Sequence, residues 1–106
     1  MSETERRAQA RVPVDMWVEE EADNAVYFQR SANVSSGGLF LEYSVPHPTG
    51  TRVRIRFTLP GIQGEVTAHA EIVKADGGLG MHLKFLDLGP DAAARIEQYI
   101  ARARMP

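Results

Sequence analysis

Three arginines near the start of the chain have the chemistry to bind a phosphate-bearing ligand. Arg7 and Arg11 are separated by three residues, and Arg6 directly precedes the first of them. A guanidinium group is planar and permanently charged, so it pairs bidentately with phosphate and can also hydrogen-bond or stack on guanine. The spacing therefore favours a nucleotide-like anion. The alternative is that these arginines only solubilise a polar tail.

A second polar segment, Asn33-Val34-Ser35-Ser36-Gly37-Gly38, complements the arginines. A side-chain amide at Asn33 can read the edge of a base, and a hydroxyl at Ser35 can bond a phosphate or a base. Strand alternation predicts that Asn33 and Ser35 share one face. Gly38 allows either close approach of the backbone to a ligand or a positive φ. The alternative is a Ser/Gly turn or bulge that binds nothing.

The rest of the chain must position these two segments. Residues 1–11 are polar and without periodicity, so we predict a flexible, ligand-clamping N-terminal segment followed by one domain over residues 12–106. Hydrophobic alternation predicts six strands, and the acidic residues Glu19, Glu20 and Glu21, together with Asp23 and Asn24, are assigned to a solvated turn after the first of them. An amphipathic helix is expected at about 90–104, beginning near Pro90, with an apolar stripe formed by Ile96, Tyr99, Ile100 and Ala103. Strands joined by short turns without intervening helices predict a mainly β fold, a six-stranded antiparallel barrel followed by a C-terminal helix. The six predicted strands are 12–18, 24–33, 39–43, 52–57, 63–75 and 79–86.

Composition narrows the function classes. The chain has 106 residues, a net charge of −2 and no cysteine, which fits one soluble domain and argues against a general nucleic-acid or membrane-surface binder. No apolar run is long enough to span a membrane, so a cytoplasmic location without membrane insertion is expected. The exposed stripe Arg52, Arg54 and Arg56 is interpreted as a solvated face, with single-stranded nucleic-acid binding as the rival. His47, His69 and His82 lack the spacing of metal ligands, and the sequence shows no catalytic constellation, so neither a metal cofactor nor an enzyme is expected.

Together, the two segments resemble a known family. Arg7 and Arg11 match an RxxxR motif, and Asn33, Ser35 and Gly38 match [D/N]xSxxG, with asparagine in place of the commoner aspartate. In this order they resemble the PilZ domain, a bacterial receptor module for cyclic di-GMP. The resemblance implies that these arginines clamp phosphates and guanine bases while the second motif contacts the ligand from the barrel.

The same resemblance implies a function and a stoichiometry. Arginine at position 6 is similar to family members that hold an intercalated dimer of cyclic di-GMP, so two ligands per chain are expected. The implied function is that of a cytoplasmic bacterial receptor whose N-terminal segment orders on binding and which signals to a downstream protein. Motility, attachment and exopolysaccharide control are the implied settings. The alternative is a PilZ-like protein-interaction adaptor that does not bind the nucleotide.

Overall fold

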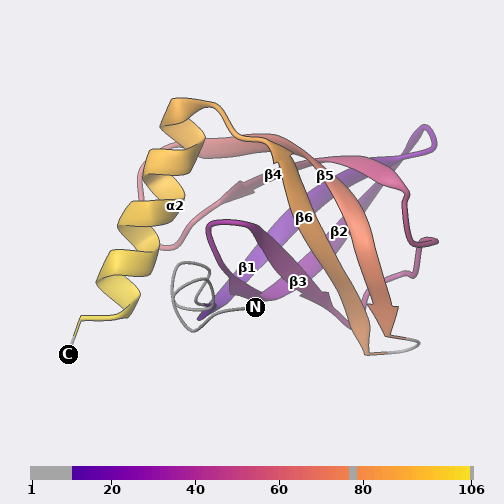
Figure 1. Cartoon of the computed structure of the whole chain (residues 1–106), viewed down its shortest axis with the longest axis horizontal. Coiled ribbons are helices and arrows are strands. Elements are labelled where there is room, and N and C mark those ends of the chain that lie inside the picture. The colour runs from indigo at the N-terminus through magenta and orange to yellow at the C-terminus, as the bar shows by residue number, and fades with distance from the viewer. Residues whose placement is uncertain (1–10, 77–78, 106) are drawn as a thin grey trace, which may run out of the picture.

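The fold is a closed antiparallel barrel with one helix packed on it (Figure 1). The computed structural model describes residues 11–76 and 79–105, without the side chain of Asp76. Around the barrel the strands follow the order β1-β2-β3-β6-β5-β4, and every neighbouring pair is antiparallel. The predicted six-stranded barrel with a C-terminal helix is therefore confirmed. The elements are β1 Val12–Ala22, β2 Ala25–Val34, β3 Gly38–Glu42, β4 Arg52–Thr58, β5 Glu65–Asp76, β6 Gly80–Asp87 and α2 Pro90–Ala103.

Alternating apolar residues fill the inside of the barrel. In β4 the side chains of Val53, Ile55 and Phe57 are buried, and the residues between them are exposed. β1 shows the same two-residue period along its length. A strand with this pattern buries one face and leaves the other in water, which fixes its register in the sheet. The outward positions are therefore the ones available for binding.

The helix α2 is held on the barrel by an apolar stripe and by polar contacts. Ala92, Ile96 and Ile100 recur every four residues and are buried. The Tyr99 hydroxyl donates to the carbonyl of Pro13 at 2.9 Å, and Arg102 Nη1 donates to the carbonyl of Gly61 at 2.8 Å. The predicted stripe also included Ala103, which is exposed, and it missed Ala92, which is buried. The contact with Pro13 ties the helix to the start of β1.

The predicted solvated turn is correct for Asp23 and Asn24 and wrong for Glu19, Glu20 and Glu21. β1 continues to Ala22, and the turn consists of Asp23 and Asn24, both with positive φ (49° and 63°). Two residues with positive φ form the tight hairpin turn that matches the twist of the adjoining strands. The strand alternation therefore carries on through the acidic run and places Glu20 inside the barrel, with 0% of its surface exposed.

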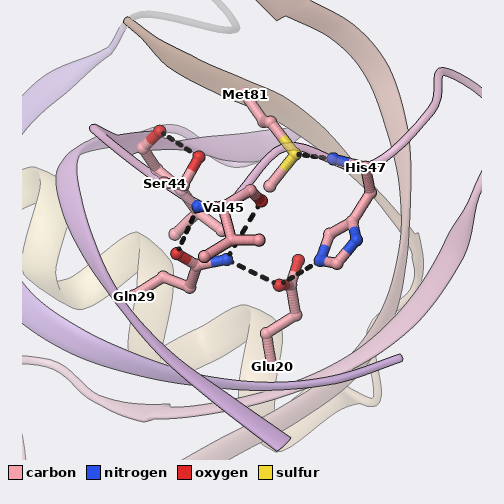
Figure 2. Close-up of polar contacts among 7 residues, drawn as sticks. Glu20, Gln29, Ser44, Val45, His47 and Met81 are labelled. Carbon is pink, nitrogen blue, oxygen red and sulfur yellow. Dashed lines mark hydrogen bonds and ion pairs between the residues drawn. The ribbon is translucent and has the colours of Figure 1, made fainter. Parts of the chain in front are cut away.

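Glu20 belongs to a buried polar cluster near the β1–β2 turn (Figure 2). Its Oε1 atom accepts a hydrogen bond from Gln29 Nε2 at 2.9 Å and lies 2.9 Å from His47 Nε2. Gln29 Oε1 in turn accepts from the backbone N–H of Val45 at 3.0 Å. Because Val45 and His47 belong to the segment between β3 and β4, the cluster fastens that segment to the strands. Within the described part of the chain, Glu20 Oε2 has no hydrogen-bond partner.

Substitution of Gln29 by alanine is expected to destabilise the domain by about 1–3 kcal/mol, because it leaves the Val45 N–H without its acceptor and removes a donor from a buried carboxylate. Urea denaturation measures the change. The matched control is Gln98→Ala, at an exposed position of α2. Its free energy of unfolding should stay within about 0.5 kcal/mol of the wild-type value. Equal stability of both variants would show that the cluster does not hold the segment.

Candidate functional site

Arg11 of the first motif and Asn33 of the second lie together at one end of the barrel. Arg11 directly precedes β1, and Asn33 lies near the end of β2. The pairing of Pro13 with Asn33 brings these two strand ends side by side. Arg11 Nη1 donates a hydrogen bond to Asn33 Oδ1 at 2.9 Å. Two residues that are 22 positions apart in the chain, at the two ends of the first hairpin, are thus in direct contact. The Arg11 side chain is exposed to solvent.

A bulge in β2 lies next to Asn33. The register between β2 and β3 shifts between Ser31 and Asn33. The Ser31 hydroxyl donates toward the backbone carbonyls of Asn33 and Phe40, each at 3.1 Å, which stabilises the irregular backbone. Bulges of this kind redirect a side chain and are common beside functional sites. Here the residue beside the irregularity is the one that contacts Arg11.

Ser35 lies in the turn that follows β2, so its position is set by the turn and not by strand alternation as predicted. Its hydroxyl accepts a hydrogen bond from the N–H of Gly37 at 3.2 Å and lies 3.4 Å from the carbonyl oxygen of Gly38. The backbone N–H of Ser35 donates to the same carbonyl at 2.9 Å. Only 3% of Ser35 is exposed. The hydroxyl therefore organises the turn, and its contact with a ligand stays a prediction.

Gly38 is required by the packing of β3 against β6. A Cβ atom built on Gly38 would lie 1.9 Å from the carbonyl oxygen of Leu83, a backbone atom that cannot swing away. The φ of Gly38 is not positive. The positive φ that was one of the two predicted reasons for this glycine is therefore not found, and the close approach that the structure shows is to the neighbouring strand. Contact of Gly38 with a ligand stays a prediction.

A depression of 410 Å³ adjoins the Arg11–Asn33 contact. Arg11, Ser35 and Gly37 line it together with Lys84 and apolar residues of β5 and β6. Sequence reasoning missed Lys84, whose place follows from its pairing with Gly38 across the β3–β6 seam. Lys84 is exposed and adds a second positive charge next to Arg11. The depression thus combines cations with the turn of the second motif.

The other two predicted arginines, Arg6 and Arg7, lie outside the described residues. Their relation to the depression follows only from the sequence. Arg11 is four residues beyond Arg7 in the same segment. It is therefore the one member of the predicted clamp that the structure places.

Comparison with known proteins decides the family. The family model described as the PilZ domain matches residues 5–102. The chain belongs to the PilZ domain family. No significant match is found among curated proteins.

Three solved structures share the fold of this PilZ domain. The PilZ domain of YcgR from Escherichia coli, solved with c-di-GMP, is 18% identical with a TM-score of 0.70, and the match covers 92% of this chain and 91% of that one. The PilZ domain of CeSA from a cellulose-synthesizing bacterium is 22% identical with a TM-score of 0.66, over 91% and 99% of the two chains. The Bacillus subtilis inhibitor of motility (MotI/DgrA) is 19% identical with a TM-score of 0.74, over 92% of this chain and 51% of that chain. The present chain therefore spans about half the length of the Bacillus subtilis protein. At these identities the likeness concerns the fold.

The arginine stripe on β4 of this PilZ domain is largely neutralised. Arg56 forms an ion pair with Glu19 on β1 and lies 3.7 Å from Glu65 on β5. Arg52 lies 3.8 Å from Glu71. Cross-strand acids of this kind reduce the positive potential that a nucleic-acid backbone requires. The stripe is better described as a paired, solvated face.

His69 and His47 make structural contacts in the described part of the chain. The backbone N–H of His69 donates to Asp87 Oδ1 at 2.9 Å, where the register between β5 and β6 shifts. That hydrogen bond, followed by one from the His69 ring, holds the pKa of Asp87 below its usual value, so the contact persists at neutral pH and is lost only in acid. His47 belongs to the buried Glu20 cluster. Among the described residues no three His, Asp or Glu side chains gather as metal ligands, and no helix is long and apolar enough to cross a membrane.

Proposed function

We propose that the chain is a receptor for cyclic di-GMP that binds the nucleotide at the Arg11–Asn33 contact. The observation that carries the proposal is the 2.9 Å hydrogen bond between these side chains, because it joins the two motifs at one place on the barrel. The cationic depression beside it supplies room and charge for an anion. Membership of the PilZ family and the nucleotide held by the YcgR domain support the same ligand.

Each predicted residue has a role in this proposal. Arg7 and Arg11 bind the phosphates and stack on or hydrogen-bond the guanines, since guanidinium groups suit both tasks. Asn33 reads a guanine edge through its amide. A neutral amide holds the Arg11 guanidinium less tightly than a carboxylate would, so the ligand displaces this contact at small cost. Because the asparagine side chain is neutral, it also lacks the negative charge that an aspartate would offer to the guanine N1–H and N2–H groups. Ser35 and Gly38 keep the turn in place.

Binding would draw the arginine segment onto the barrel and change the surface that a downstream protein meets. Ordering of a segment by a ligand is a common form of signal transmission. We place the receptor in the bacterial cytoplasm, without catalysis of its own. The fold neighbours from a motility inhibitor and a cellulose-synthesizing bacterium support motility or exopolysaccharide control as its setting.

Isothermal titration calorimetry of the whole chain tests the ligand. Cyclic di-GMP is expected to bind with two nucleotides per chain, because Arg6 adds a cation for the four phosphates of an intercalated dimer. GTP and cyclic di-AMP serve as controls and should bind at least tenfold more weakly. A one-to-one stoichiometry would remove the role given to Arg6. Absence of binding would remove the receptor and favour the adaptor alternative.

Substitution of Lys84 by alanine is expected to weaken cyclic di-GMP binding about 3- to 10-fold and to reduce its dependence on salt, because one cation is lost from the rim of the depression. Titrations at several salt concentrations measure both effects. Arg54→Ala, at an exposed position of β4 that does not line the depression, removes the same charge and should change neither. If the two variants behave alike, Lys84 lies outside the site.

A further inference from the structure

The outer surface of β1, β2 and the end of β3 exposes three large aromatic side chains, Trp17, Phe28 and Tyr43, which we call the aromatic face. Their exposed fractions are 60%, 68% and 78%. Small soluble proteins seldom leave clustered aromatic surface in water, and such clusters mark binding sites. The contacts described so far use none of these side chains. The aromatic face therefore needs a separate explanation.

Two depressions flank the ridge formed by Trp17 and Phe28, because both residues line both of them. The smaller has a volume of 240 Å³ and is bounded by Arg30, Glu42 and Tyr43. The larger has a volume of 470 Å³ and reaches across β1 to Arg56. Pockets beside exposed aromatic residues are typical places for the anchoring side chains of a protein partner. Neither depression includes a residue of the proposed nucleotide site.

The aromatic face is held in a fixed arrangement. Arg30 forms an ion pair with Asp15, and its guanidinium carbon lies 5.4 Å from the centroid of the Trp17 ring. Tyr43 has a φ of 48°, which is unusual for a bulky residue, and its N–H donates to the carbonyl of Leu79 at 3.0 Å. A strained backbone that holds an aromatic ring in solvent is a reason to look for function. A surface ordered in advance loses less entropy on binding.

The charges around the aromatic face select the partner. Asp15 and Glu19 are matched by Arg30 and Arg56. Glu21 and Glu42 project from the same surface, and within the described residues neither has an ion-pair partner. Arg54 is the register partner of Glu21, and Glu65 lines the larger depression, so five acids stand against three arginines on this surface. The surface thus carries an excess of negative charge, which repels a nucleic-acid backbone and attracts a basic polypeptide.

We propose that the aromatic face docks a positively charged segment of a partner protein, whose apolar side chains enter the two depressions while its Lys or Arg side chains meet Glu21 and Glu42. The site is distinct from the nucleotide site and does not depend on it. It gives the domain a second binding surface, formed by the barrel itself.

Selection from a random twelve-residue peptide library displayed on phage tests the proposal. The whole chain, without nucleotide, is the target of the selection. Peptides that also bind the double variant Phe28→Ser/Tyr43→Asn are discarded, because they bind outside the aromatic face. Both substituted side chains are exposed, and asparagine tolerates the positive φ at position 43. The variant should keep the wild-type melting temperature. The selected peptides, synthesised without tryptophan, are then titrated against the emission of Trp17, the only tryptophan of the chain.

The expected peptides combine Lys or Arg with bulky apolar residues, and Phe28→Ser should weaken their binding at least tenfold. Glu42→Gln should weaken it about threefold, and Leu86→Ser, at an exposed apolar position on β6, should leave it unchanged. Failure to enrich peptides, an acidic consensus or equal binding to the double variant would overturn the proposal. A dimer that Phe28→Ser dissociates, or a change of Trp17 emission with a single-stranded oligonucleotide, would overturn it as well. None of these outcomes alters the nucleotide titration, so the two proposals fail separately.

Discussion

Replacement of Arg11 by alanine is expected to weaken cyclic di-GMP binding by about 10- to 100-fold. A hydrogen bond between charged groups contributes about 1.5–3 kcal/mol, and each 1.4 kcal/mol is a factor of about ten in affinity. Arg11 offers several such donors at the edge of the depression, next to Asn33. Isothermal titration calorimetry measures the loss directly.

The control for Arg11→Ala is Arg54→Ala. Arg54 is an exposed arginine on β4, so its removal makes the same change in net charge. It should alter the affinity less than twofold. The free energy of unfolding of Arg11→Ala should also lie within about 1 kcal/mol of the wild-type value, because the hydrogen bond between Arg11 and Asn33 is exposed. Equal losses of affinity in the two variants would mean that only overall charge matters and that the contact does not mark the site.

Replacement of Gly38 by alanine is expected to destabilise the domain by about 3–5 kcal/mol, which for a domain of this size lowers the melting temperature by about 15 °C or more. The added Cβ would lie 1.9 Å from the carbonyl oxygen of Leu83, and 3.0 Å from its carbon. Both atoms belong to the backbone of β6, so β3 and β6 must separate where Gly38 pairs with Lys84. Thermal denaturation followed by circular dichroism measures the effect.

Gly89→Ala is the matched control for Gly38→Ala. A Cβ atom on Gly89 meets nothing within 4 Å, and its φ is −64°, which any residue adopts. The expected loss of unfolding free energy is within about 1 kcal/mol, and it arises mainly because Gly89 precedes the first turn of α2, where alanine is a poorer cap than glycine. A stable Gly38→Ala variant would contradict the account of the β3–β6 seam. It would also return Gly38 to the role of a ligand contact alone.

Much of the fold follows from local patterns in the sequence. The alternation of Val53, Ile55 and Phe57 with three arginines is enough to identify β4 and its buried face. Ile96 and Ile100 identify the packed side of α2 in the same way. The two motifs were recognisable because residue type and spacing carry their chemistry. The structure places Arg11 beside Asn33, and the binding role of these residues stays a prediction.

Features that depend on distant partners could not be predicted. Three successive glutamates suggest a solvated turn. Nothing near them in the sequence indicates that the Gln29 and His47 side chains contact Glu20 inside the barrel. The position of Lys84 depends on which strand follows β3 around the barrel. Ser35 was assigned by alternation, but β2 ends one residue before it. Each of these depends on register or closure, which alternation alone does not encode.

The central claim is that the two motifs form one nucleotide site, and a titration followed by nuclear magnetic resonance tests it most directly. Cyclic di-GMP is added to the ¹⁵N-labelled whole chain while backbone and side-chain amide signals are recorded. The account predicts that the largest changes occur at Arg11, the Asn33 side-chain amide, Gly37 and Lys84, while the Trp17 indole signal stays in place. Saturable changes centred on the Trp17 face, or no changes at Arg11 and Asn33, would contradict it.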